Sequence, residues 1–147
     1  MNDYKVLKVT DQNDINDLEK FYSNFSYAEQ KDLKFDFKNE LFFKIIDNKN
    51  EIIGIASVSD EDYTYDNLKR FIKPEMRGKK LADFLLDKII EIAKIEKKIR
   101  LTGYYKSSEE KAKEYFIEKG FKVIDKSLII DNVEFSNVLL KLSSINK

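Results

Sequence analysis

The sequence predicts a single mixed α/β (α+β) domain built on one central sheet, and three observations support this prediction. Strand-like and helix-like patterns alternate along the chain. The predicted strands are joined both by tight turns and by helical crossovers, which indicates a sheet with antiparallel and parallel pairs. The 147 residues are 42% hydrophobic, which is enough for a sizeable core. We therefore interpret residues 1–147 as one domain with about seven strands and about four helices.

The first two elements are a strand and an amphipathic helix. Tyr4 to Thr10 alternates weakly between apolar and polar residues, as a half-buried strand does. A helix is predicted from about Asp14 to Asn24, because its apolar residues recur on one face. Either Asp11 or Asn13 could cap it, since both side chains can accept a hydrogen bond from the first turn.

A short helix and a hairpin are predicted next. Ser26-Tyr27-Ala28-Glu29 fits a capping box, which predicts a helix from Tyr27 to about Leu33. Two apolar runs, Leu41–Ile46 and Ile52–Ser59, then have the composition of strands. Asp47-Asn48-Lys49-Asn50 separates them and is rich in residues that tolerate left-handed conformations, so a hairpin turn is expected there.

The middle of the chain predicts a strand, a long helix and another strand. Asp60 to Tyr65 is an acidic, aromatic connection, and Leu68–Ile72 is the strand that follows it. The helix from Lys79 to about Lys97 is well defined, since its apolar residues form two adjacent rows at a spacing of four. Ile99 to Tyr105 is predicted to be a strand.

The last elements are a helix and a closing hairpin. Ser107-Ser108-Glu109-Glu110 contains a second capping box, and Gly120 is a suitable residue to end the helix that follows. Lys122–Ile130 and Val133–Leu142 are predicted strands. They are joined at Asp131-Asn132, a pair that favours a tight turn.

The composition limits the chemistry that the chain can perform. The 27 basic residues balance the 27 acidic ones, which argues against bulk attraction to nucleic acid or to an anionic membrane. Residues 1–5 carry no apolar signal segment and no uncharged run approaches membrane-spanning length, so a cytoplasmic protein is expected. The sequence has no cysteine and no histidine, which excludes disulfides, thiolate or histidine metal sites and a Ser-His-Asp triad. No metal is expected.

The most informative stretch is Pro74 to Ala82, between the strand Leu68–Ile72 and the long helix. From Lys69 to Lys80 there are six basic residues and one acidic residue, a local excess of +5 in a neutral chain. A strand, a basic turn and a helix N-terminus form an anion site, because the first helical N–H groups lack partners within the helix. Gly78 has no Cβ and lets the backbone approach a ligand closely. An ordinary solvated basic face is the alternative interpretation.

Two segments, Arg77–Ala82 and Ala112–Phe121, have the spacing of known motifs. The first reads Arg-Gly-Lys-Lys-Leu-Ala and resembles (Gln/Arg)-x-x-Gly-x-(Gly/Ala), with Lys80 in place of the usual glycine. The second resembles Ala-x-x-Phe-Tyr-x-x-x-Gly-Phe, with Phe116 in place of the tyrosine. Together with the element order, they give nearly the whole chain a resemblance to the GNAT superfamily of acetyl-CoA-dependent N-acetyltransferases. The resemblance implies a GNAT-like mixed central sheet.

By this resemblance acetyl-CoA is the co-substrate, and backbone amides of the basic turn wrap its pyrophosphate. Its pantetheine arm enters between the splayed fourth and fifth strands, here Leu68–Ile72 and Ile99–Tyr105. A side chain at Lys80 either crowds the phosphates or adds a charge contact, and the sequence leaves both open. The implied cofactor-binding residues are Phe71, Ile72, Arg77, Gly78, Lys79, Lys80, Leu81, Ala82 and Phe116.

Acetyl transfer to an amine needs a base and a donor to the thioester oxyanion. The resemblance places the base on or before the fourth strand, at Asp66, and Glu61 or Asp62 in the adjacent loop could act through a water. Asp66 is otherwise interpreted as a turn residue. The oxyanion donor is expected at the backbone amide of Ile72 or its neighbour.

The departing thiolate also needs a proton. Phe116 cannot supply one, and Tyr115 is rotated by about 100° around the helix from that position. The expected acids are therefore Tyr104, Tyr105 or water, although each tyrosine is also interpreted as a packing residue.

The sequence thus predicts an N-acetyltransferase that acts on a primary amine of a small molecule, peptide or protein. Direct attack in a ternary complex is expected, because cysteine is absent. The alternative is a non-catalytic GNAT-fold module that binds CoA or acyl-CoA as a sensor or interaction partner.

An aminoacyl-tRNA acceptor is disfavoured because the basic charge is local. Val133–Leu142 is apolar enough to pair across a homodimer. A partly aromatic acceptor wall is predicted from Phe21, Tyr22, Phe25, Tyr27, Phe35 and Phe37.

Overall fold

Seven strands form one sheet in this computed structural model, which describes residues 3–26 and 33–142. Their order across the sheet is β1-β2-β3-β4-β5-β7-β6. Only β4 and β5 are parallel, and the other neighbouring pairs are antiparallel. The predicted mixed sheet is confirmed. The strands are β1 (Lys5–Val9), β2 (Leu41–Ile46), β3 (Ile52–Asp60), β4 (Thr64–Ile72), β5 (Arg100–Lys106), β6 (Lys122–Ile130) and β7 (Val133–Lys141).

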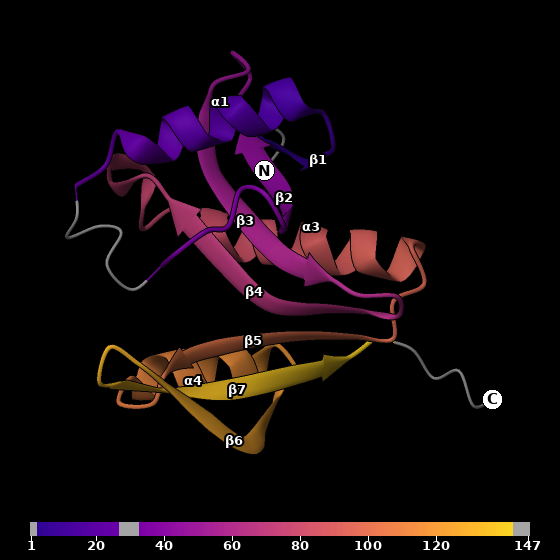
Figure 1. Cartoon of the computed structure of the whole chain (residues 1–147), viewed down its shortest axis with the longest axis vertical. Helices are drawn as coiled ribbons and strands as arrows, with labels where there is room; N and C mark the ends of the chain where they lie inside the picture. Colours follow the sequence, from indigo (N-terminus) through magenta and orange to yellow (C-terminus); the bar gives the residue numbers. More distant parts are fainter. Residues whose placement is uncertain (1–2, 27–32, 143–147) are drawn as a thin grey trace.

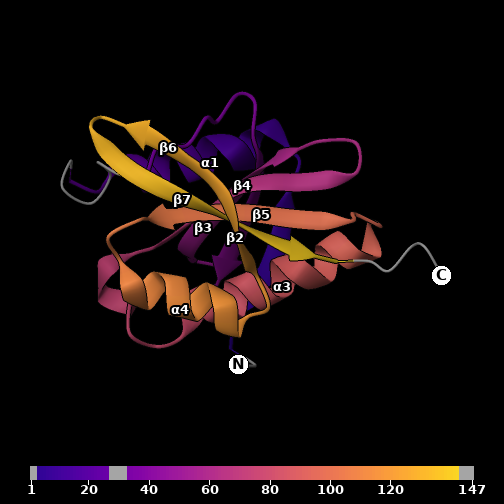
Figure 2. The ribbon, with the colours of Figure 1, turned by 90° about the horizontal axis from the view of Figure 1, so that it is seen from below.

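Helices cover both faces of the sheet (Figures 1 and 2). Helix α1 (Gln12–Ser23) lies on one face, and α3 (Leu81–Ile95) and α4 (Glu110–Glu118) lie on the other. A single 3₁₀ turn, η1 (Pro74–Met76), precedes α3. The short helix predicted from Tyr27 falls at residues 27–32, outside the described part of the chain, so the structure describes three α-helices where the sequence predicted about four.

Each face of the sheet has its own core. Strand alternation sends Phe43 and Ile45 to the α3 face and Phe42 to the α1 face. On the α3 face, most residues of the predicted helical rows are buried, with Leu85 and Ile89 fully inaccessible to solvent. Burial of each such side chain stabilises the fold by about 1.5–3 kcal/mol. The α1 face is aromatic, and most of the rings predicted to form an acceptor wall pack there: Phe21, Tyr22, Phe25, Phe35 and Phe37.

Strand β4 begins four residues earlier than predicted. The stretch Asp60 to Tyr65 was expected to be a connection, but Tyr65 is fully buried and pairs in the sheet. The strand was missed because a bulge interrupts its alternation. At Asn67 the backbone has φ of 59°, and the β3–β4 register shifts nearby.

The sequence predicted the C-terminal end of helix α4 correctly but not its N-terminal end. The capping box at Ser107 is wrong, because its hydroxyl lies 2.7 Å from that of Ser136 and no side chain caps the helix. The C-terminus is as predicted. Gly120 has φ of +98°, and Phe121 N–H donates to the Phe116 carbonyl at 3.0 Å, as in a Schellman motif.

The closing hairpin has the predicted turn, with positive φ at both Asp131 and Asn132. Strand β7 pairs with β5 on one side and with β6 on the other. Its backbone groups are therefore occupied, and the predicted pairing of this strand across a dimer is wrong.

Candidate active site

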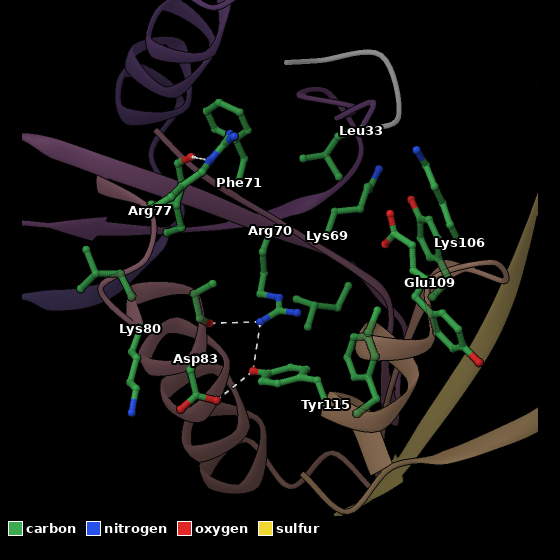
Figure 3. A pocket seen from close by; sticks show the side chains of 18 of the residues that line it. Leu33, Lys69, Arg70, Phe71, Arg77, Lys80, Asp83, Lys106, Glu109 and Tyr115 are labelled. Atoms are coloured by element: carbon green, nitrogen blue, oxygen red, sulfur yellow. Dashed lines mark hydrogen bonds between the residues drawn. The ribbon is translucent and has the colours of Figure 1, made fainter. Parts of the chain in front are cut away.

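Strands β4 and β5 diverge, as the splayed pair was expected to. They pair at three positions, of which the last is Leu68 opposite Gly103. Beyond that point the two strands are no longer paired with each other, over residues 69–72 of β4 and 104–106 of β5. A cavity of about 860 Å³ opens between them and extends to α3 and α4 (Figure 3).

The backbone of β4 alternates between β3 and this gap. Lys73 N–H donates to Ile53 C=O at 3.0 Å, so the hydrogen-bonding groups of Phe71 and Lys69 also face β3. Those of Ile72 and Arg70 face the gap. The N–H of Ile72, predicted as a donor, thus faces the gap, while its C=O accepts from Arg77 at 2.7 Å. Phe71 also lines the cavity, but its hydrogen-bonding groups face β3.

The basic turn presents unpaired amides to the cavity. Phe84 N–H makes the first α3 bond, to Lys80 C=O, so the three preceding amides have no helical acceptor. Gly78 (φ +80°) and Lys80 (φ +62°) both adopt left-handed conformations. A Cβ at Gly78 would meet nothing within 4 Å, so this backbone faces open space. Among the predicted turn residues the cavity is lined by Arg77, Gly78, Lys80, Leu81 and Ala82, but not by Lys79.

The side chains of Arg77 and Lys80 leave the turn in different directions (Figure 3). Arg77 folds back onto β4, where its Nε donates to Ile72 C=O at 2.7 Å and its guanidinium lies 5.2 Å from the Phe71 ring centroid. The Lys80 side chain extends outward from the turn in Figure 3, away from Arg70. Arg77 therefore stabilises the turn through its side chain.

Arg70 connects three elements across the cavity, and the sequence did not single it out as a site residue. Its Nη1 donates to Ala82 C=O on α3 at 3.1 Å and to the Tyr115 hydroxyl on α4 at 3.3 Å. The Tyr115 hydroxyl in turn donates to Asp83 at 2.8 Å. These contacts join the walls of the cavity (Figure 3).

The two aromatic residues of α4 both line the cavity. Phe116 is buried against the rings of Tyr105 and Phe121, at 6.2 and 5.1 Å. The rotation of Tyr115 away from Phe116 is as expected, but it brings the hydroxyl to Arg70 and Asp83. Burial raises the pKa of Tyr115. A hydrogen bond from Lys119 holds the pKa of Asp83 below its usual range.

The far end of the cavity, which we call the acceptor end, lies beside β5 and the start of α4. Lys69, Lys106 and Glu109 point toward it near Leu33 (Figure 3). Tyr104 lines it as well, with its ring 5.5 Å from that of Phe135. Burial, together with the nearby charge of Glu40, raises the pKa of Tyr104 to about 12. Tyr105 also lines the cavity.

None of the three carboxylates considered as the base lines the cavity. Asp66 accepts hydrogen bonds from Thr64 and Thr102 at 2.9 and 3.1 Å, so it holds the β4 bulge to β5. The carbonyls of Glu61 and Asp62 bind Lys98 in the β3–β4 turn. The carboxylates that do line the cavity are those of Asp83 and Glu109.

Within residues 3–26 and 33–142, no group of three or more acidic side chains is arranged to hold a metal ion. No helix in this part of the chain is long and apolar enough to cross a membrane.

Comparisons with known proteins agree with this geometry. The family described as Acetyltransferase (GNAT) domain matches residues 6–142, and no curated protein sequence matches the chain. Spermidine N-acetyltransferase from Vibrio cholerae, solved as a dodecamer, has a TM-score of 0.74 at 14% identity, over 99% of this chain and 97% of that one. IAA acetyltransferase from Bacillus cereus has a TM-score of 0.70 at 12% identity, over 95% and 99%. At these identities the two structures show a shared fold.

Proposed function

The chain belongs to the GNAT acetyltransferase family and is an N-acetyltransferase, and from this premise we propose how its cavity carries acetyl-CoA and an amine. The observation that carries the proposal is the gap between β4 and β5, which joins the unpaired amides of the α3 N-terminus to the acceptor end. One continuous cavity can thus hold a phosphate, an extended linker and a reacting group in sequence.

The pyrophosphate of acetyl-CoA binds at the basic turn. The amides of Leu81, Ala82 and Asp83 supply donors and the helix dipole adds partial positive charge. Gly78 allows the phosphates to approach the backbone. The N–H and C=O of Arg70 and the N–H of Ile72 face the gap, where they bind the amide groups of pantetheine, whereas Ile72 C=O accepts from Arg77. One of their N–H groups also donates to the thioester oxyanion.

The base is Glu109. The only other carboxylate that lines the described cavity, Asp83, is bound by Lys119 and Tyr115, and its lowered pKa makes it a poor proton acceptor. The Glu109 carboxylate has no hydrogen bond or ion pair in the described structure, and it points toward the acceptor end. It can take the proton of the acceptor ammonium directly or through a water. The neutral amine then attacks the thioester carbonyl, the C–N bond forms and the C–S bond breaks.

Tyr104 assists the departing thiolate by a hydrogen bond. A phenol with a pKa of about 12 stays protonated at neutral pH. It does not transfer its proton completely, because a thiol has a pKa near ~8.5 and the transfer would be uphill. The thiolate instead receives, directly or through a water, the proton that the nitrogen loses as the amide forms. Tyr105, which packs on Phe116, shapes the wall of the cavity.

The test is amine-dependent release of CoA, measured for the wild type, Glu109→Gln and Asp66→Asn. We expect Glu109→Gln to lower kcat by about tenfold or more while the calorimetric Kd for acetyl-CoA stays the same. Asp66→Asn should keep the wild-type kcat, because Asp66 lies outside the cavity. Equal activity of Glu109→Gln and wild type would rule out Glu109 as the base. Binding of acetyl-CoA without turnover on any amine would leave only a CoA-binding module.

A further inference from the structure

We propose that the acceptor amine carries a carboxylate on the same molecule, and that Lys69 binds this carboxylate at the acceptor end of the cavity. The inference rests on the proposed acetyl transfer and names the class of its acceptor. It is carried by the surroundings of one buried ammonium group.

Lys69 lines the cavity although its side chain is only 9% exposed. Its ammonium donates to Lys34 C=O at 2.5 Å and to Glu40 at 2.6 Å, and it lies 5.6 Å from the centroid of the Phe35 ring. An ammonium has three N–H donors. The third donor of Lys69 has no acceptor in the described part of the chain. A buried donor of a charged group is costly to leave unpaired, so an acceptor from a ligand is favoured there.

Glu40 holds Lys69 in place from behind the cavity lining, although its charge is near enough to raise the pKa of Tyr104. Its second oxygen accepts from the Ser57 hydroxyl at 3.0 Å and from Asp36 N–H at 2.9 Å. Ser57 is fully buried, and Glu40 is not among the residues that line the cavity. A molecule at the acceptor end therefore meets the ammonium of this ion pair rather than its carboxylate.

The neighbouring groups fit a molecule with both charges. Glu109 is available to the acceptor ammonium, and Lys106 adds a second basic side chain to the wall. Leu33, Tyr104 and Phe135 add apolar surface to the lining of the cavity. A polyamine fits this lining poorly, because it would place a further cation against Lys69. Lys69 is already paired with Glu40 and has one remaining N–H donor. It therefore suits a ligand carboxylate, which carries a single negative charge.

The test compares two acceptors that differ only in the carboxylate, phenylalanine and phenethylamine, with spermidine as a third. In the wild type we expect kcat/KM to be about tenfold or more higher for phenylalanine, equivalent to ~1.4 kcal/mol. The double variant Lys69→Met/Glu40→Gln removes the ammonium without leaving an unpaired buried carboxylate. It should lower kcat/KM for phenylalanine by about tenfold and leave that for phenethylamine nearly unchanged. Lys88→Met, on the exposed face of α3, is the matched control.

Binding of 3-phenylpropanoate to the CoA complex gives a readout that needs no turnover. Calorimetry should detect it with the wild type and Lys88→Met but not with the double variant. If this pattern appears while no amine is acetylated, the carboxylate subsite stands and the proposed reaction falls. If phenethylamine or spermidine is preferred by the wild type, the subsite is overturned while the acetyl transfer stands.

Discussion

Replacing Gly78 by alanine separates the cost of its backbone conformation from its role at the cavity. A left-handed conformation costs an L-residue about 1–2 kcal/mol, and Gly78 has φ of +80°. No steric term is added, because a Cβ there meets nothing within 4 Å. Gly120 is a matched control, since its φ is +98° and a Cβ would lie 3.4 Å from Leu140. In a chain of 147 residues, both variants should lower Tm by about 2–8 °C, as measured by calorimetric melting.

Of the two glycines, only Gly78 lines the cavity, so the two variants should differ in their affinity for acetyl-CoA. The new methyl group of Gly78→Ala stands where the phosphates approach the turn amides. We expect its Kd for acetyl-CoA to rise by about tenfold or more, while Gly120→Ala keeps the wild-type Kd in isothermal titration. If Gly78→Ala binds acetyl-CoA as tightly as Gly120→Ala does, the phosphate site at this turn is refuted.

Three further predictions concern stability. The pKa of Asp83 lies below its ordinary 3.8, so the stabilisation from its bond to Lys119 is complete above that value and lost as pH falls through the lowered pKa. Asp83→Asn should therefore lose stability at pH 7 but match the wild type near pH 2 in unfolding followed by circular dichroism, and an equal deficit at both values would contradict this. Lys98→Met should cost about 1–3 kcal/mol in urea unfolding, because the ammonium binds three oxygens of the β3–β4 turn, and a neutral effect would show that the turn stands without it. Phe116→Ala should cost about 3–5 kcal/mol in the same assay, since the ring is only 5% exposed, and a loss below 1 kcal/mol would mean that the helix repacks.

The sequence predicted the fold well at positions where the residue type itself favours a particular backbone conformation. Gly120 ends α4 because its φ is positive, and Asp131-Asn132 turns the last hairpin for the same reason. The β4 bulge carried no such signal. Asn67 adopts its left-handed conformation to let β4 meet both β3 and β5, and no neighbour in sequence requires it.

The candidate site was only half predictable for a similar reason. The proposed phosphate turn is a contiguous segment, so its residues could be read from the motif. The acceptor end is assembled from separate segments, and the ion pair of Lys69 with Glu40 joins residues 29 positions apart. Asp66 was assigned by counting along β4, and the bulge directs its carboxylate to Thr102 instead. Arg70 was counted only as part of a basic run, because its partners on α3 and α4 are remote in sequence.

The short parallel ladder between β4 and β5 divides the sheet into two pieces, each made of consecutive chain. Strands β1 to β4 come from residues 5–72, and β5 to β7 come from residues 100–141. Neighbours in sequence can pair early during folding, whereas the junction requires segments that are far apart to meet. The cavity does not exist in either piece alone. A ligand bound there therefore favours the fully assembled molecule over any partly folded form and protects the junction selectively from local opening.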